Sequence, residues 1–138
     1  MEGREPGEKI IREMMGSEMA ERLLASAASG TFGSSIAGYA IDQAFGGIWT
    51  RPGLDRKERS LVTMAVMIAL RQPNEFAIHM NIALNNGLTL DEIEEALIQT
   101  LPYVGYPAVA TALAAANKVI QERGLDNSPD YSGHRGLL

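Results

Sequence analysis

The stretch Trp49-Thr50-Arg51-Pro52-Gly53-Leu54 lies at the centre of this chain and decides how the sequence around it is interpreted. Arg51 precedes a proline and Gly53 follows that proline, so the stretch predicts a loop. A helical pattern begins directly after the loop, and a second helical pattern follows a break at Pro73. We therefore expect a loop followed by two consecutive helices.

The boundaries of these two helices are marked by capping residues. Asp55 and Glu58 have the spacing of a capping box, which predicts a helix from Asp55 to about Leu70. Pro73 ends this helix and can stand at the head of the next one. The second helix is expected over 74–86, before the stop signal at 85–87.

Helical periodicity extends over most of the remaining chain, and no segment alternates convincingly as a strand. Thr89 and Glu92 form a second capping box, with Leu88 and Ile93 as a hydrophobic staple. Pro102 and Gly105 are expected to kink or end the helix that follows. The sequence therefore predicts an all-α fold of about six to seven helices. The helices not yet named are expected over 8–15, over 17–29, over 34–45 (ended by Gly46-Gly47) and, rich in alanine, over 109–120.

Length and composition indicate one globular domain. The chain has 138 residues, of which 46% are hydrophobic and 21% charged. We expect a single domain over 1–125 and a flexible tail over 126–138, which is rich in Gly, Ser, Pro and Asn. The net charge of -5 and the lack of a basic block argue against nucleic-acid binding.

The chain contains no cysteine, which excludes disulfides, thiol nucleophiles and thiolate metal sites. This composition fits a reducing, cytoplasmic compartment. The N-terminus has no apolar segment of the kind that signal peptides carry. The longest apolar run, 61–70, is too short to span a bilayer and predicts a helix buried on nearly all sides.

Glu75 and His79 lie one helical turn apart and therefore share a face of the second helix. Spacing alone is compatible with an exposed ion pair that contributes little, or with a carboxylate that orients a histidine for acid–base work. Arg51 and Arg59 lie upstream and are either surface arginines or anion ligands. Because Arg59 near a helix N-terminus gains nothing from the helix dipole, a negative partner is indicated.

Other candidate residues have a structural interpretation beside the functional one. For Trp49, Tyr103 and Tyr106 the sequence favours core packing over contact with a ligand, and His134 in the tail fits solvent exposure. One histidine in the candidate site, without any cysteine, supplies too few ligands for a catalytic zinc ion. We therefore expect no metal and no cofactor, and we interpret the acidic cluster as a solvated helix face made of Asp91, Glu92, Glu94 and Glu95.

Several motifs in this order resemble the carboxymuconolactone decarboxylase family, and the resemblance covers roughly residues 8–123. The residues that carry it are Gly47-Ile48-Trp49-Thr50-Arg51-Pro52-Gly53-Leu54-Asp55, Arg59-Ser60-Leu61, Glu75, His79, Ala83-Leu84-Asn85-Asn86-Gly87-Leu88-Thr89 and Tyr103-Val104-Gly105-Tyr106-Pro107-Ala108.

This resemblance implies an alkylhydroperoxidase-D-like helical subunit that assembles into homotrimers or homohexamers. It also implies decarboxylation of a butenolide with a γ-carboxylate, giving the enol-lactone of the β-ketoadipate route of aromatic catabolism. Peroxidase relatives of this fold depend on a Cys-x-x-Cys pair that the chain lacks. The segment Arg71-Gln72-Pro73 replaces what is usually a small-residue turn, and the tail has no counterpart, so the exact substrate stays open.

The resemblance assigns roles to the candidate residues. His79 is the general acid that delivers a proton to carbon, and Glu75 orients it and raises its basicity. Arg51 and Arg59 are expected to bind the substrate carboxylate and the lactone oxygen, and the sequence leaves open which arginine binds which group. Trp49 and Tyr103 complete the substrate-binding set. No cofactor is needed, because the lactone is its own electron sink.

Two alternative functions remain open from the sequence. One is a cofactor-free isomerase or cyclase of natural-product biosynthesis that uses the same Glu/His pair. The other is a non-catalytic binding protein, which would leave Glu75 and His79 separated or solvent-exposed rather than facing a pocket.

Overall fold

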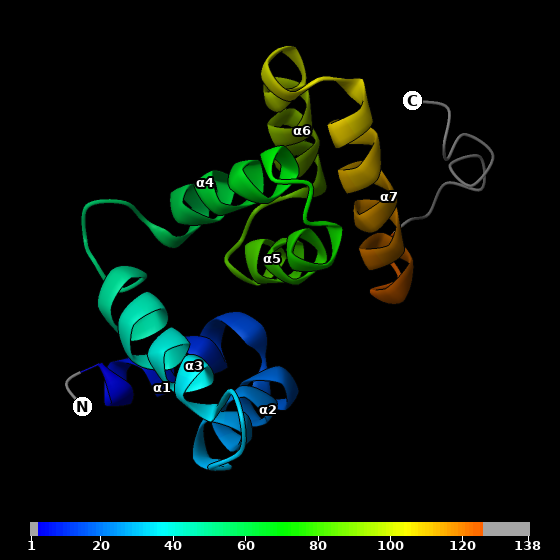
Figure 1. Ribbon diagram of the computed structural model, residues 1–138. Coiled ribbons are helices and arrows are strands. Elements are labelled where there is room, and N and C mark those ends of the chain that lie inside the picture. Colours follow the sequence, from blue (N-terminus) through cyan, green and yellow to red (C-terminus); the bar gives the residue numbers. More distant parts are fainter. Residues whose placement is uncertain (1–2, 126–138) are drawn as a thin grey trace. The chain divides into compact units, whose positions relative to one another are not determined.

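The computed structural model describes residues 3–125, and all of the regular structure in this range is helical (Figure 1). This confirms the predicted all-α class. The elements in chain order are α1 (Arg4–Met15), α2 (Ser17–Ala28), α3 (Ser34–Tyr39), the π-helix η1 (Ala40–Ile48), α4 (Arg56–Ala69), α5 (Pro73–Asn85), α6 (Leu90–Val104) and α7 (Tyr106–Glu122).

The chain divides into two compact units, Met1–Arg59 and Ser60–Leu138, here called the N-terminal and C-terminal units. The single domain expected over 1–125 stays a prediction, and the predicted tail, including His134, lies outside the described residues. Within residues 3–125, no helix combines the length and the apolarity that a membrane crossing requires.

The N-terminal unit is held together by an unusually close contact between α1 and η1. A Cβ atom added at Gly7 would lie 2.2 Å from the Ile41 carbonyl oxygen, and one added at Gly46 would lie 2.0 Å from the Gly3 carbonyl oxygen. Only glycine therefore allows the two backbones to approach this far. The side chain of Arg4 donates to both carboxylate oxygens of Asp42 at 2.5 and 3.1 Å, which locks the same contact electrostatically.

The predicted end of the third helix was wrong. Gly46-Gly47 was expected to stop a helix over 34–45, but α3 continues directly into η1, which ends only at Ile48. The reason is the close approach to α1: Gly46 is buried, and its missing side chain makes room for a neighbouring backbone rather than ending the helix. The π-helical turns also bring Trp49 onto Phe45, with ring centroids 6.3 Å apart.

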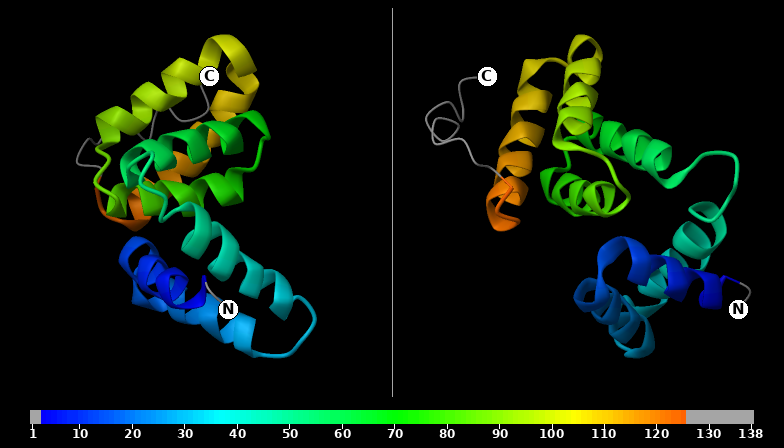
Figure 2. Two further views of the ribbon diagram at one scale, coloured as in Figure 1. Left: turned by 90° about the vertical axis from the view of Figure 1, so that its left-hand side faces the viewer. Right: turned by 180° about the vertical axis from the view of Figure 1, so that it is seen from behind.

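The core of the C-terminal unit lies between α4, α5, α6 and α7. Helix α7 packs against both α5 and α6, an arrangement that Figure 2 shows from two sides. The predicted staple residues Leu88 and Ile93 are buried in this core. Its other fully enclosed members are Met64, Ile68, Phe76, Met80, Ala83, Leu97, Val109, Ala112, Ala116 and Val119.

The prediction that segment 61–70 is buried on nearly all sides was wrong for the single chain. Met64 and Ile68 are enclosed in the core, as expected. On the opposite side of α4, Val62, Val66 and Leu70 are 57%, 45% and 62% exposed. These three residues are spaced four apart, Val62 and Val66 on α4 and Leu70 directly after its last residue, and so form one apolar stripe, which we call the α4 stripe.

Three helices end in the same hydrogen-bonded turn, and one of the three lacks the usual glycine. After α5 and α7, Gly87 and Gly124 adopt the left-handed conformation with φ of 99° and 64°. After α4 that position is Arg71, with φ of 56°; its N–H donates to the Ile68 carbonyl, and the next N–H donates to the Met67 carbonyl. This is a Schellman motif in which a side chain occupies a position that favours glycine.

We predict that Arg71→Gly stabilises the protein by roughly 0.5 to 1 kcal/mol, because it relieves a left-handed residue that carries a Cβ atom. Arg71 is exposed, so the change removes little packing. The matched control is Gly87→Ala, which imposes the same strain elsewhere and should destabilise by roughly 1 kcal/mol. Chemical denaturation of the three proteins measures both effects; a destabilised Arg71→Gly protein would contradict the prediction.

We predict that the α4 stripe lies in a contact between copies of the chain, because an exposed apolar row of this kind is typical of an interface. Light scattering at micromolar concentration should give a mass above that of one chain, with a trimer or hexamer expected from the family resemblance. Val66→Lys should lower that mass, whereas Glu94→Lys on α6 should leave it unchanged. A wild-type monomer would refute the idea.

Candidate functional site

Two of the predicted substrate-binding residues line one pocket of the N-terminal unit. Trp49 and Arg51 form part of a cavity of about 470 Å³ between α1 and the loop that leads to α4. Thr50 stabilises the loop by donating to the Gly46 carbonyl at 2.7 Å. The predicted loop over Trp49–Leu54 is thereby confirmed, and α1 supplies the facing wall with Pro6, Lys9, Ile10 and Glu13.

The charges of this pocket leave a local excess of positive charge. Of its three cationic residues, Arg56 donates to Glu13 at 2.6 Å. Asp55 accepts from the Glu58 N–H at 2.8 Å in the predicted capping box. Within residues 3–125 no ion pair or side-chain hydrogen bond holds Arg51 or Lys9, so the pocket suits an anionic group.

Arg59 is connected to Arg51 by a hydrogen bond that the sequence did not predict. Its guanidinium donates to the backbone carbonyl of Arg51 at 2.9 Å. Arg59 therefore fixes the backbone that presents Arg51, in addition to bringing a second positive charge to the loop. The sequence indicated a negatively charged partner for Arg59, whereas the acceptor of this hydrogen bond is a backbone carbonyl oxygen.

Glu75 and His79 lie one turn apart on α5 of the C-terminal unit, as expected from their spacing. Glu75 is exposed and His79 is partly buried, with its Nδ1 atom enclosed. Burial lowers the pKa of His79 below its ordinary value of 6.5, and the Glu75 carboxylate acts in the opposite direction without reversing the shift. At neutral pH the imidazole of the free protein is therefore mostly neutral.

Tyr103 and Tyr106 lie on either side of Gly105, where α6 ends and α7 begins. Their side chains are 80% and 61% exposed, so neither has the core-packing role that the sequence favoured. Tyr103 thus has a surface position, and its assignment as a substrate contact stays a prediction.

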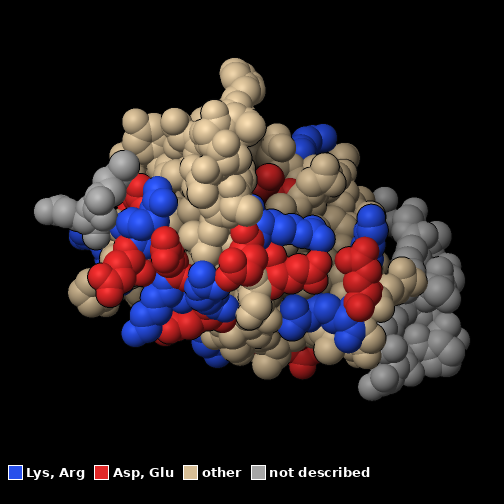
Figure 3. All heavy atoms as spheres, turned by 90° about the horizontal axis from the view of Figure 1, so that it is seen from below, with Lys and Arg blue, Asp and Glu red and all other residues tan. Residues whose placement is uncertain are grey.

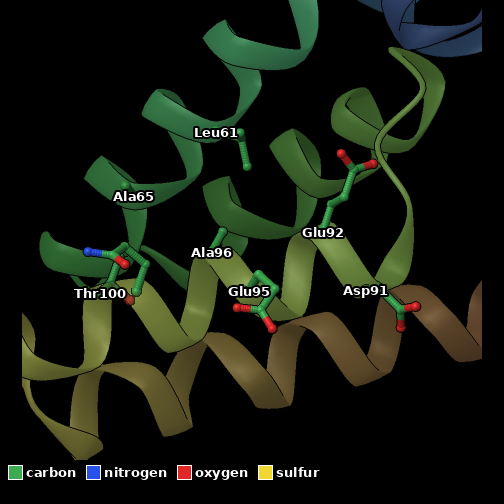
Figure 4. A pocket seen from close by; sticks show the side chains of 8 residues that line it. Leu61, Ala65, Asp91, Glu92, Glu95, Ala96 and Thr100 are labelled. Carbon is green, nitrogen blue, oxygen red and sulfur yellow. The ribbon is translucent and has the colours of Figure 1, made fainter.

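The acidic residues of α6 border a groove instead of forming a metal site. In the described part of the chain, no three His, Asp or Glu side chains are grouped so as to hold a metal ion. A groove of about 520 Å³ is lined by Leu61 and Ala65 of α4 and by Asp91, Glu92 and Glu95 of α6, which Figure 4 labels. Three carboxylates at its edge would repel an anion, so this groove is no candidate for an acidic substrate.

On the face shown in Figure 3, Lys and Arg side chains are interspersed with Asp and Glu. Ion pairs of the N-terminal unit include Arg12 with Glu21, and Arg22 with Glu18 at 2.8 Å. This face has no continuous basic field of the kind that binds a nucleic-acid backbone.

Sequence reasoning missed Lys9 as a candidate site residue. It lies on the same side of α1 as Glu13, whose pKa is lowered by the Arg56 hydrogen bond and, to a smaller extent, by the charge of Lys9. The helical spacing of Lys9 and Glu13 was visible in the sequence. Nothing in the sequence, however, indicated that this side of α1 faces the loop at Trp49.

Comparison with known proteins places these residues in a family. The model of the family described as "Carboxymuconolactone decarboxylase family" matches residues 37–118. The chain is 34% identical over 119 residues to the 4-carboxymuconolactone decarboxylase of Acinetobacter baylyi, covering 86% of this chain and 87% of that protein. It is 36% identical over 117 residues to the nitrosuccinic acid decarboxylase of Metarhizium robertsii, covering 84% and 80%. Since both the family model and these relatives span most of the sequence, the chain belongs to the carboxymuconolactone decarboxylase family.

Proposed function

We propose that this protein is a cofactor-independent carboxy-lyase that converts a γ-carboxy butenolide, similar to 4-carboxymuconolactone, into an enol-lactone. The observation that carries the proposal is the similarity to a 4-carboxymuconolactone decarboxylase along nearly the whole of both chains. The cationic pocket at Trp49 and Arg51 supports it, because such a substrate is an anion.

The reaction breaks the bond between the ring carbon and its carboxylate, and carbon dioxide leaves. The electron pair of that bond moves through the ring to the lactone carbonyl oxygen and forms a dienolate. A proton then adds to carbon and restores a neutral product. The protein must hold the anion, stabilise the oxyanion and supply the proton, and none of these steps requires an external electron sink.

We assign binding of the substrate anion to residues of the N-terminal unit. Arg51 contacts the substrate anion, since a guanidinium pairs well with a carboxylate in a bidentate manner. Lys9 adds a second positive charge from the facing wall of the same pocket. Arg59 is a positioning residue that holds the Arg51 carbonyl, and its charge also favours an oxyanion near the loop.

We assign the proton to His79. Its lowered pKa means that the free protein holds this imidazole mostly neutral at pH 7. The Glu75 carboxylate on the same helix favours the protonated form of His79 and so helps to keep the acid supplied with its proton.

A second candidate substrate is a nitro acid, and the similarity to a nitrosuccinic acid decarboxylase favours it. A nitro group next to the departing carboxylate accepts the electron pair as a nitronate, just as the lactone carbonyl does in the dienolate. Both substrates combine an acid with a built-in electron sink. The shared requirement is thus a cationic pocket and a proton donor.

The direct test is a turnover assay of the purified protein with carboxymuconolactone and with nitrosuccinate, each monitored by release of carbon dioxide. The protein is first chelated and dialysed exhaustively, and we expect activity to survive. Activity that is lost on chelation and restored by one metal would overturn the cofactor-independent mechanism. Release from neither substrate would overturn the proposed function.

We predict that His79→Ala lowers kcat by roughly a hundredfold or more, the usual effect of losing a general acid. Because the acid must be protonated, kcat of the wild type should fall as pH rises through the pKa of His79 in the complex. Glu75→Gln removes a charge that raises this pKa, so its profile should move to lower pH with KM little changed. Circular dichroism verifies folding. A folded His79→Ala protein with normal turnover would place the acid elsewhere, with Tyr103 and Tyr106 next to be tested.

We predict that Arg51→Ala raises KM and lowers kcat, because it touches both anion capture and oxyanion stabilisation. Lys9→Ala should raise KM severalfold with a smaller effect on kcat, since its charge lies on the opposite wall of the pocket. Lys118→Ala on α7 is the matched control and should change neither constant. If all three variants behave alike, the pocket at Trp49 does not receive the substrate.

A further inference from the structure

The C-terminal unit contains a second pocket, of about 310 Å³, that shares no residue with the site proposed above. Side chains from α5, α6 and α7 line it, together with Leu125. Its wall is mainly apolar and consists of Met80, Ile93, Leu97, Leu113, Ala116 and Ile120. The size and the apolar wall are those of a small-molecule site.

One polar side chain interrupts this apolar wall. Asn117 of α7 lines the pocket and is only 6% exposed. No hydrogen bond joins its carboxamide to any residue between 3 and 125, and its nitrogen and oxygen are not among the enclosed side-chain atoms that lack a partner. The amide therefore has access to the space of the pocket that it lines. It offers one donor group and one acceptor to a ligand there, within an otherwise mainly apolar wall.

The charges at the mouth of the pocket restrict the ligand. Asp91 and Glu94 lie on the first turns of α6, border the pocket and are exposed to solvent. Their carboxylates disfavour a negatively charged group at this position. The pocket thus selects against the anions that suit the site at Arg51.

We propose that this pocket is a binding site for a small uncharged molecule with a hydrocarbon body and one carboxamide-like group that pairs with Asn117. The apolar body occupies the space between Met80, Leu97 and Ile120. The ligand carbonyl accepts from the Asn117 amide nitrogen, and a ligand N–H donates to the Asn117 amide oxygen. The site is independent of the decarboxylase assignment.

Hexanamide and hexanoate are the matched probes, because they share one hydrocarbon chain and differ in charge and in donor groups. Titration of the full-length isotope-labelled protein, followed by NMR, should show hexanamide shifting the Asn117 side-chain amide signals together with those of Leu97 and Ile120. We expect a dissociation constant on the order of millimolar, the range for so small a ligand. Hexanoate should bind at least tenfold more weakly. Equal binding of the two probes, or no binding of hexanamide, would overturn the proposal.

Asn117→Leu separates a ligand-binding role from a structural one. If the amide serves a ligand, this variant keeps the shape, loses hexanamide binding and unfolds at the same or a higher temperature than the wild type. Asn81→Leu on α5 is the control: Asn81 donates to the Ala77 carbonyl and accepts from Arg123, so its loss should lower the unfolding temperature and leave hexanamide binding intact. An Asn117→Leu protein that unfolds at a lower temperature, or that still binds hexanamide, would contradict the proposal.

Discussion

The backbone contact between α1 and the π-helix is the constraint on which the candidate site depends. Without side chains at Gly7 and Gly46, the two helices approach until carbonyl oxygens lie about 2 Å from where Cβ atoms would be. The hydrogen bond from Arg4 lowers the pKa of the Asp42 carboxyl, so this carboxylate keeps its charge to a lower pH than an ordinary aspartate does. Because α1 forms one wall of the pocket at Trp49, its packing on η1 determines how far apart the two walls stand. The geometry of this pocket therefore rests on two glycines that are not among the residues lining it.

The state of His79 is set by two opposing effects, and their order matters for any mechanism. Desolvation disfavours the imidazolium, whereas the Glu75 carboxylate favours it, and desolvation is the larger of the two. A proton donor with a lowered pKa is a stronger acid, but a smaller fraction of it is protonated at neutral pH. In the proposed mechanism, the balance between these two effects therefore decides how often the donor carries its proton.

The sequence predicted much of the fold because its signals were local. Both capping boxes, including Thr89 with Glu92, form as expected, and the helix boundaries fall within a few residues of the predicted ones at most ends. The failures involve partners that local patterns do not reveal. Gly46 reads as a helix stop, yet it makes room for α1, and Lys9 becomes a site candidate only because of that contact. For the same reason, the pairing of Glu75 and His79 could be read from spacing, whereas the direction of the pKa shift depended on burial.

The distribution of charge suggests how a chain with a net charge of -5 can still select an anion. The pocket at Trp49 in the N-terminal unit has cations at Arg51 and Lys9 that no ion pair within residues 3–125 holds, whereas the two pockets that border the start of α6 carry carboxylates. Asp91 belongs to both of the latter, so a single helix terminus repels anions from two apolar cavities. Under the proposed function, charge would decide among these three pockets. An anionic substrate is favoured beside the Arg51 guanidinium and disfavoured beside the acidic first turn of α6.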